Sequence, residues 1–369
     1  MIEPDELAAW VRLLATPSIG RETARKLLAC YGSPQTALAA STASRSAVVG
    51  AAAAQALAGS SAEIDALVTA TLAWLAQPED APRSVITLGD PQYPAALLQT
   101  ADPPLLLYAL GRIEVSAGPA LAIVGSRNPT PQGSENARAF ARHLSDAGVG
   151  VVSGLALGID AAAHEGALTG PGRTIAVVGT GLDRVYPRRN LDLARRIARD
   201  GLVLSEHPLG TPPLAGHFPA RNRIIAGLAR GTLVVEAALQ SGSLITARLA
   251  SEAGRDVFAI PGSIHSPLSR GCHALIKQGA KLVETAQDIL EELDLAVSRP
   301  SVRAAEAPGL PGPADPLREA LGFDPVGLEA LVARTGWSAA ALNIRLLEME
   351  LDGAVARLPG QLFQRIAQG

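Results

Sequence analysis

Between residues 120 and 293 the apolar residues gather in short unbroken runs, and a stretch with helical spacing follows each run. The runs do not alternate with polar residues, as strands with one solvated face do. Unbroken runs are typical of strands buried on both faces of a parallel sheet. Seven such units predict an α/β fold, an extended Rossmann-like doubly wound parallel sheet, with strands at 120–124, 149–152, 174–178, 202–204, 232–235, 257–260 and 281–283.

Residues 1–78 are rich in Ala and Leu and predict a separate helical domain, SAM-like or helix-hairpin-helix-like. Within it, residues 17–28 have the form of a tight turn followed by a helix with basic residues near its start. Such a turn can hold a DNA phosphate through the backbone amides of the helix N-terminus. Ser18 stands where that motif usually has Gly, so a purely structural turn fits equally well.

The predicted sheet domain spans residues 83–295, because two further apolar runs, at 84–88 and 105–110, precede the first of the seven units. A segment that contains five prolines follows it and predicts a semi-rigid linker at 296–316.

The C-terminal residues 317–369 predict a winged-helix domain, with helices followed by a short hairpin. A DNA-reading helix needs cations that face phosphates. The corresponding helix, expected at 338–351, carries one cation, Arg345, against Glu348 and Glu350. We therefore expect this domain to contact a protein or to act as a spacer, and not to read DNA.

The formal net charge of −3 means that the chain as a whole is not a basic nucleic-acid binder. Residues 119–285, in contrast, hold 18 Lys and Arg against 12 Asp and Glu. Two cysteines cannot form a four-ligand zinc site, so no metal is expected. No apolar run is long enough to cross a membrane, and the acidic start lacks the features of a secretory signal, so we expect a cytoplasmic protein.

Small polar residues and arginines follow the predicted strands, at the edge where ligands bind in doubly wound sheets. Glycine and serine let backbone amides approach an anion, a helix N-terminus adds partial positive charge, and arginine matches phosphate oxygens. Tight-turn geometry accounts for any one of these loops, but five at one edge favour a polyanion. The loops are Gly125–Arg127, Ser153–Asp160, Gly179–Asp183, Phe218–Arg223 and Ser241–Ser243.

The motifs of nucleotide enzymes are missing. There is no P-loop and no G-x-S-x-G elbow, and Arg184 stands where the dinucleotide fingerprint needs a third Gly or Ala, so no cofactor is expected. Asp160 and His164 could share a helix face, although a helix cap and a partly buried histidine are the simpler interpretation. Glu236 ends a strand at the same edge, where it could act as a catalytic acid or hold nearby arginines.

Only 12 aromatic residues occur in the chain, and two of them, Tyr186 and Phe218, lie near this edge. Bases would therefore find few stacking platforms, and phosphate contacts would carry the binding. We expect little sequence preference.

At these motifs the sequence resembles the DNA-processing protein family DprA, also called Smf, of bacterial natural transformation (competence). The matching segments are Gly125–Arg127, Ser153–Asp160, Gly179–Asp183, Tyr186–Asn190, Phe218–Gly227, Gln240–Ala247, Ala259–Ser263 and Gly271–Cys272. The resemblance implies single-stranded DNA binding by a Rossmann-like domain, loading of the RecA recombinase, and a homodimer built by this domain. His273 departs from the family, which usually has Asn at that position.

The loops and the resemblance together define a candidate DNA-binding site and no catalytic residue. Its residues are Gly125, Ser126, Arg127, Ser153, Gly154, Arg188, Asn190, Phe218, Arg221, Asn222, Arg223, Ser241, Gly242, Ser243 and Gly262. An alternative is a Rossmann-like hydrolase that acts on a nucleotide derivative. Enzymes of that kind typically carry a P-G-G-x-G-T-x-x-E motif. The corresponding loop here begins at Ala238 and has no Glu until Glu252, and this absence argues against an enzyme.

Overall fold

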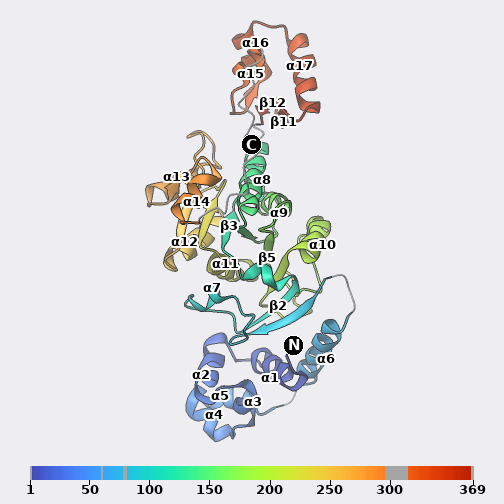
Figure 1. Ribbon diagram of the computed structural model, residues 1–369, viewed down its shortest axis with the longest axis vertical. Coiled ribbons are helices and arrows are strands. Elements are labelled where there is room, and N and C mark those ends of the chain that lie inside the picture. The colour runs from blue at the N-terminus through green and yellow to red at the C-terminus, as the bar shows by residue number, and fades with distance from the viewer. Residues whose placement is uncertain (1, 60, 78–80, 296–314, 367–369) are drawn as a thin grey trace.

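The computed structural model describes residues 2–59, 61–77, 81–295 and 315–366. A group of helices, a large mixed sheet with helices on both faces, and a small C-terminal unit follow one another along the chain (Figure 1). The expected linker at 296–316 lies outside the described residues, except for Asp315 and Pro316, which cap and begin the first C-terminal helix. Within the part that the structure describes, no helix combines the length and apolar character needed to cross a bilayer.

The large sheet has nine strands in the order β1-β2-β6-β5-β4-β3-β7-β8-β9. The seven strands β3–β9 are parallel to one another, as the unbroken apolar runs predict. Strands β1 and β2 add an antiparallel edge beside β6. The strands are β1 (Arg83–Thr87), β2 (Leu106–Gly111), β3 (Ala120–Val124), β4 (Gly150–Ser153), β5 (Thr174–Val178), β6 (Leu202–Ser205), β7 (Gly231–Val234), β8 (Asp256–Ala259) and β9 (Lys281–Leu282).

The chain reverses its direction of travel across the sheet between β3 and β7. From β3 it builds outward through β4, β5 and β6, and it then returns to place β7 on the other side of β3. The two strands are neighbours, yet the loops that leave their carboxyl ends run to opposite faces of the sheet. This switch point is where doubly wound sheets open a crevice for a ligand.

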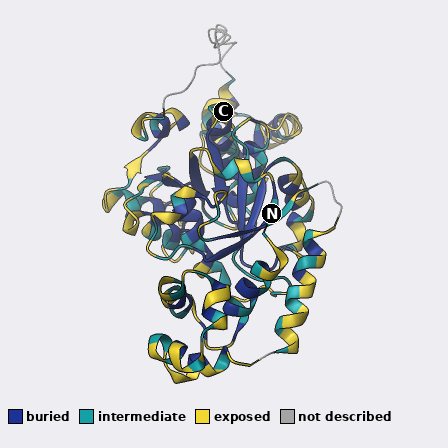
Figure 2. Ribbon diagram, turned by 60° about the horizontal axis from the view of Figure 1, so that its bottom comes forward, coloured by how far each residue is buried: buried dark blue, intermediate teal, exposed yellow. Residues whose placement is uncertain are grey.

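Helices bury both faces of the sheet, and the strands between them are the most buried part of the chain (Figure 2). Every residue of β3 and of β5 is buried, which is the physical reason that neither strand alternates. One core lies against α8 (Pro131–Asp146), α9 (Ile159–Ala167) and α14 (Ala286–Glu292). The opposite core lies against α7 (Ala95–Leu98), α11 (His217–Leu228), α12 (Ser243–Glu252) and α13 (Arg270–Lys277). The 3₁₀ helices η1 (Ile113–Ser116) and η2 (Arg188–Asn190) lie in connections.

The N-terminal helices pack on the antiparallel edge and on α10 (Leu191–Asp200) through one shared apolar cluster. Trp74, for example, meets the ring of Tyr108 on β2 at 6.1 Å between centroids. The expected hairpin turn lies between the first two helices, and Ser18 there has a φ of 71°, a left-handed conformation that favours glycine. The helices are α1 (Pro4–Ala15), α2 (Arg21–Tyr31), α3 (Pro34–Ala39), α4 (Thr42–Val49), α5 (Ala51–Ala56) and α6 (Ala62–Leu75).

The C-terminal unit has the winged-helix arrangement that the sequence predicts, with its own apolar core. Its three-stranded antiparallel sheet has the order β10-β12-β11. The elements are α15 (Pro316–Leu321), β10 (Val326–Gly327), α16 (Leu328–Thr335), α17 (Ala339–Leu351), β11 (Val355–Leu358) and β12 (Leu362–Arg365). Helix α17 leaves Ile344, Leu347 and Leu351 more than half exposed.

Candidate nucleic-acid interface

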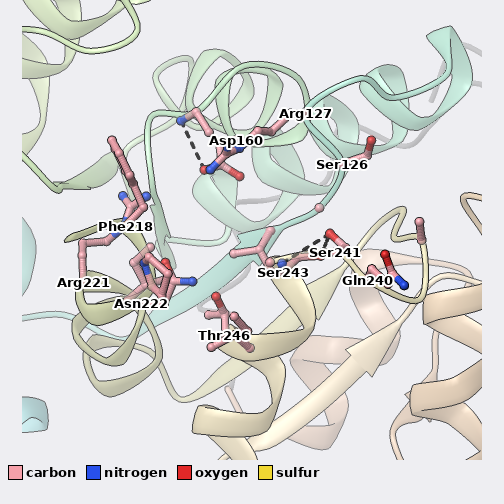
Figure 3. Close-up of a pocket in the computed structure, with 18 of the residues that line it drawn as sticks. Ser126, Arg127, Asp160, Phe218, Arg221, Asn222, Gln240, Ser241, Ser243 and Thr246 are labelled. Atoms are coloured by element: carbon pink, nitrogen blue, oxygen red, sulfur yellow. Dashed lines mark hydrogen bonds between the residues drawn. The ribbon is translucent and has the colours of Figure 1, made fainter. Parts of the chain in front are cut away.

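A cavity of about 660 Å³ opens at the switch point, beyond the carboxyl ends of β3 and β7. We call it the switch-point cavity. Helices α11 and α12 form two of its walls, and the loops that follow β3 and β7 form the others (Figure 3). Nine of the residues expected from the sequence line it, namely Gly125, Ser126, Arg127, Phe218, Arg221, Asn222, Ser241, Gly242 and Ser243.

The loop after β3 brings an exposed cation to this cavity. The backbone N–H of Ser126 donates to the carbonyl of Glu236 at 2.7 Å, which ties this loop to the one after β7. The Ser126 hydroxyl accepts from the Asn128 N–H at 3.1 Å, so the turn is tight. Arg127 follows it with an exposed side chain that makes no ion pair among the described residues. It is therefore available to an anion.

The N-terminus of α12 supplies the second anion-binding feature. Helix α12 begins at Ser243, inside the cavity wall, and the N–H groups of its first three residues donate within the turn, to Ser241 Oγ at 3.3 Å, to the Ser241 carbonyl at 3.1 Å and to the Gly242 carbonyl at 3.2 Å. The hydroxyls of Ser241 and Ser243 lie 2.7 Å apart and both border the cavity. Backbone dipoles and hydroxyl donors of this kind favour a negatively charged group.

Arg221 and Asp160 are two buried, oppositely charged residues in the wall of the cavity. The Arg221 guanidinium donates to the carbonyl of Gly154 at 2.7 Å and to that of Val177, and its Nε has no hydrogen-bond partner. Burial lowers the pKa of Arg221 to about 10, although nearby Asp160 opposes that shift and Arg127 adds to it. Burial likewise raises the pKa of Asp160, against the influence of Arg221. With Arg127, the ionised lining carries a net charge of +1.

The loop after β4 is held in place by residues that the sequence suggested as DNA ligands. Ser153 is fully buried and donates to the carbonyl of Ile123 at 2.7 Å. The Asn190 amide donates to the carbonyls of Leu155 and Ala156 at 2.9 and 3.1 Å. Ser153, Gly154 and Asn190 are absent from the cavity lining, because their polar groups or backbone fix the loop instead.

Gly154 has a clear steric reason for lacking a side chain. A Cβ atom there would lie 2.5 Å from the guanidinium of Arg221, so a larger residue would displace the arginine. The Asp160 carboxylate accepts from the N–H groups of Gly154 and Ala156 at 3.1 and 3.3 Å, which closes the loop over the arginine.

Arg188 and Gly262 lie away from the switch-point cavity. Arg188 is exposed on η2, among the arginines of the following helix. Gly262 packs on Ser269, whose hydroxyl would clash with an added Cβ. Neither contributes to the cavity lining.

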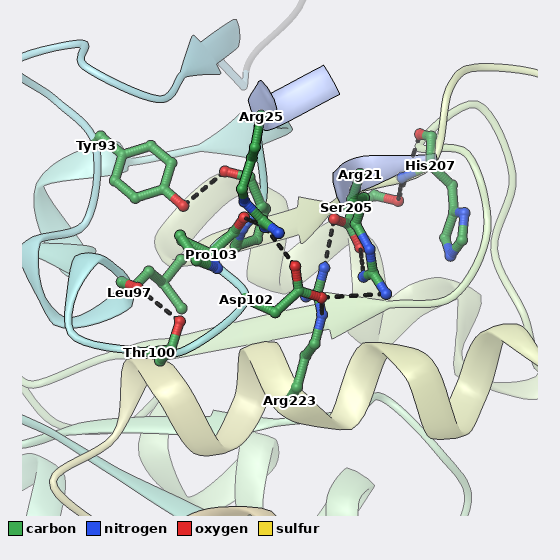
Figure 4. A network of polar contacts seen from close by, with 12 residues as sticks. Arg21, Arg25, Tyr93, Leu97, Thr100, Asp102, Pro103, Ser205, His207 and Arg223 are labelled. Atoms are coloured by element: carbon green, nitrogen blue, oxygen red, sulfur yellow. Dashed lines mark hydrogen bonds and ion pairs between the residues drawn. The ribbon is translucent and has the colours of Figure 1, made fainter. Parts of the chain in front are cut away.

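Arg223 faces away from the cavity and joins an ion-pair network with the N-terminal helices (Figure 4). Its Nε lies 3.0 Å from Asp102 Oδ2 and its Nη2 lies 2.5 Å from Glu206 Oε1. Arg21 of α2 bridges the same two carboxylates at 3.1 and 3.3 Å, and Arg25 pairs with Asp102. The basic residues of the predicted hairpin motif are therefore engaged within the protein.

Glu236 acts as a structural acceptor at the start of α8. Its carboxylate accepts from the Thr130 hydroxyl at 2.6 Å and the Thr130 N–H at 2.9 Å, while the Thr130 hydroxyl caps Gly133 N–H at 2.9 Å. Burial raises the pKa of Glu236, and these hydrogen bonds oppose the rise. Of the two interpretations from sequence, the contacts favour a structural one, with Thr130 and not an arginine as the partner.

Besides Asp160, the lining residues with polar side chains that were not among the expected set are Tyr186, Gln240 and Thr246. Tyr186 is half exposed and its ring lies 5.5 Å from that of Phe218, so the cavity has one aromatic pair at its margin. Thr246 follows Ser243 by three residues, the spacing of one helix face, and that spacing was a usable signal in the sequence.

The sequence profile of the family described as DNA recombination-mediator protein A matches residues 84–294, more than half of the chain. The chain belongs to this family. The profile of the DprA winged-helix domain matches residues 301–361. Among curated relatives of the family, Protein Smf of Escherichia coli K12 is 41% identical over 300 residues, 79% of each chain. DNA processing protein DprA of Streptococcus pneumoniae R6 is 53% identical over 205 residues, which cover 56% of this chain and 72% of that protein.

Two solved structures of DprA proteins share the fold of this family member. The Streptococcus pneumoniae protein superimposes with a TM-score of 0.68 at 39% identity and covers 77% of this chain and 97% of its own. The Helicobacter pylori protein, whose structure is described for its single-stranded DNA binding mode, gives a TM-score of 0.53 at 33% identity over 58% of this chain and 96% of its own. The similarity extends over most of each solved chain.

Proposed function

We propose that this chain binds single-stranded DNA in the switch-point cavity and assists a RecA-class recombinase in natural transformation. One observation carries the proposal: Arg127 and the N-terminus of α12 meet across a cavity at the switch point of the sheet. Membership of the DprA family and the DNA-binding relative from Helicobacter pylori support it. Action on DNA beside RecA fits a protein that works in the cytoplasm.

Phosphate contacts carry most of the binding in this proposal. The lining offers Arg127, serine hydroxyls and the positive end of the α12 dipole, all of which favour phosphate oxygens. Its aromatic residues are the pair Tyr186 and Phe218, which leaves stacking a minor contribution. We infer that the site tolerates any base sequence.

A homodimer through the Rossmann-like domain completes the proposed assembly. Strand β9 is an edge of the sheet, and Leu282 on it is 45% exposed. Ile264, in the loop after β8, is 73% exposed. Exposed apolar side chains at a sheet edge suit contact with a second copy.

The hydrogen bonds of the two carboxylates in this region, Asp160 and Glu236, favour a role in binding over one in catalysis. Asp160 accepts hydrogen bonds from the Gly154 and Ala156 backbone, and Glu236 accepts from Thr130. A general acid or base has to reach a substrate proton within hydrogen-bond distance. Both carboxylates instead hold loops together, so we favour a DNA-binding role over hydrolysis of a nucleotide derivative.

The test is a titration of the full chain against fluorescent oligonucleotides of mixed sequence, single-stranded and duplex, with fluorescence anisotropy as the readout. We expect saturable binding of the single strand at least about tenfold tighter than that of the duplex. Equal affinity for the two forms, or no binding, would refute the proposal. RecA loading is tested separately, by the rate of RecA ATP hydrolysis on single strands coated beforehand with single-strand-binding protein.

A further inference from the structure

A second cavity, of about 420 Å³, lies beside the switch-point cavity and shares no lining residue with it. Two loops separate the pair. Leu155 and Val185 line the second cavity, whereas their neighbours Ala156 and Tyr186 line the first. We call the second one the aliphatic cavity. It is bounded by α10, by the ends of β2 and β6, and by the loops after β4 and β5.

The walls of the aliphatic cavity are hydrocarbon. Leu155, Leu182 and Val203 line it, together with Ala194 and Ala198 of α10, and all five are less than a tenth exposed. No aromatic ring and no serine, threonine, asparagine or glutamine is among its described lining residues. The side chains of these walls therefore offer a ligand dispersion contacts and apolar burial, with no partner for a polar group.

Arginines surround this apolar space. Arg184, Arg195, Arg196 and Arg199 belong to the lining, and all four are exposed while the aliphatic walls are buried, so the cations lie at the outer margin. Arg184, Arg195 and Arg199 have neighbouring Asp partners at 2.9–3.4 Å, mostly exposed pairs of small energetic weight. The Arg196 side chain makes no ion pair among the described residues. No acidic residue is among the described lining residues.

We propose that the aliphatic cavity binds an acidic peptide segment of a partner protein, with a bulky apolar side chain in the cavity and carboxylates on the arginines of α10. The volume suits one or two large side chains, and arginine forks match carboxylates in geometry. The proposal does not depend on DNA binding at the switch-point cavity.

The chemistry of the walls favours a peptide over a nucleotide as the occupant. A nucleobase has hydrogen-bonding atoms around its edge, and each one left unpaired against an aliphatic wall loses the hydrogen bond that it made to water. A leucine or phenylalanine side chain carries no such atoms. Phosphates could pair with the arginines, but the cavity beneath them would reject the base.

The probe is a short fluorescein-labelled peptide of glutamates followed by a leucine and a phenylalanine, titrated into the full chain with anisotropy as the readout. Two control peptides separate the apolar contribution to binding from the electrostatic one. In the first, serines replace the leucine and the phenylalanine; in the second, glutamines replace the glutamates. We expect saturable binding of the first peptide, and a loss of about tenfold or more with each control. Absence of saturable binding overturns the proposal.

Two variants locate the site. Arg196→Glu removes the unpaired cation, and Ala194→Leu places extra volume in the cavity; each should weaken the peptide about tenfold or more. Arg142→Glu, an exposed arginine of α8 outside both cavities, is the matched control and should leave binding unchanged. If circular dichroism shows that the Ala194→Leu variant does not fold, the Arg196→Glu variant, which changes an exposed residue, still tests the location of the peptide site.

An oligonucleotide titration of the same variants tests the competing occupant. We expect Arg196→Glu to change single-strand affinity no more than Arg142→Glu does. If Arg196→Glu and Ala194→Leu weaken the oligonucleotide and leave the peptide unaffected, the cavity belongs to the nucleic-acid site and the proposal is wrong. Unchanged peptide binding by both variants also overturns it.

Discussion

The Nε atom of Arg223 lies 3.0 Å from Oδ2 of Asp102, and the same carboxylate forms ion pairs with Arg21 and Arg25 of the N-terminal helix α2 (Figure 4). Arg223 is next in sequence to Asn222, which lines the switch-point cavity. Helix α11 thus borders the proposed DNA site with one face and anchors the N-terminal helices with another. The arginine was expected to touch DNA, but its contacts are structural.

Removing the Asp102 charge should loosen this anchor. In Asp102→Asn three arginines face one remaining carboxylate, Glu206, and we expect the unfolding free energy to fall by about 1–3 kcal/mol. Urea denaturation measures the loss. Asp192→Asn is the control, because Asp192 pairs with Arg195 at 3.4 Å on an exposed surface. This substitution should lower the unfolding free energy by less than about 0.5 kcal/mol. Equal effects of the two variants would contradict this interpretation.

Arg127→Ala should weaken single-strand binding without affecting stability. The arginine is exposed and has no ion-pair partner among the described residues, so its loss removes a charge-assisted contact worth about 1–3 kcal/mol. Anisotropy titration measures the affinity, and a thermal melt verifies the fold. Arg142 is also exposed and does not line the cavity, so the Arg142→Ala variant should bind as the parent protein does. An Arg127→Ala variant with parental affinity would remove this residue from the site.

Single-strand affinity should fall steeply with salt and vary little with sequence. Phosphate contacts release counterions, and the logarithm of the binding constant should change with the logarithm of salt concentration by about −0.7 per phosphate neutralised. Titrations at several salt concentrations with different homopolymers measure both quantities. A flat salt dependence, or a strong preference for one homopolymer, would point to base recognition.

His164 should make the protein less stable as the pH falls. The imidazole is fully buried; Leu155 N–H donates to its Nε2 at 3.3 Å, so Nδ1 carries the proton toward Thr174 Oγ1 at 2.7 Å. Burial lowers its pKa from 6.5 to about 3. Below about pH 6.5 His164 binds a proton in the unfolded chain but stays neutral in the folded protein. The unfolding free energy therefore decreases as the pH falls, by up to about 1.4 kcal/mol per pH unit.

Denaturation of the parent and of His164→Asn between about pH 7 and pH 4 isolates this effect. The variant should lose stability less steeply with falling pH, whatever its stability at neutral pH. Burial also lowers the pKa of His207 to about 4 and raises that of Asp160, but both groups remain in the variant and cancel in the comparison. Parallel pH profiles would show that folding does not lower the pKa of His164, and they would contradict this prediction.

Deleting the chain after Arg299 should leave single-strand affinity within about threefold of the parent value. Helix α17 presents Ile344, Leu347 and Leu351 to solvent, and its one cation, Arg345, is paired with Glu348 at 2.8 Å and Asp315 at 3.1 Å. Such a surface suits a protein contact better than a phosphate backbone. Anisotropy gives the affinity, and light scattering checks that truncation leaves the assembly state unchanged. A loss of about tenfold or more would assign DNA contact to the winged helix.

The positions of strands β3–β9 and their parallel direction followed from the sequence, whereas the strand order and the antiparallel edge of β1 and β2 did not. Runs such as 120–124 and 174–178 are apolar at nearly every position because both faces of the sheet are covered, and a strand with one solvated face would alternate instead. The same runs fix where each strand ends, and hence which loops meet at the carboxyl edge. The shared position of Gly125–Arg127 and Ser241–Ser243 at one edge therefore follows from the pattern of apolar runs alone.

Which side chains face the cavity could not be read in the same way. Arg221, Asn222 and Arg223 are consecutive on α11, and successive residues of a helix point about 100° apart, so one motif sends its side chains to three places. Arg221 is buried in the cavity wall, Asn222 lines the cavity with a partly exposed side chain, and Arg223 pairs with Asp102. The position of a residue in a sequence motif therefore does not tell whether its side chain faces the cavity.

By itself, the sequence determined the parallel sheet, the edge at which its loops gather and the winged helix with its poor supply of cations, because these follow from local patterns of apolar and charged residues. Only the tertiary structure decided the roles of the individual polar side chains. Arg21 and Asp102 are distant in sequence, as are Arg221 and Gly154, and their pairing depends on how separate elements pack. The energy of a charge depends on its burial and its partners, and both exist only once the chain has folded.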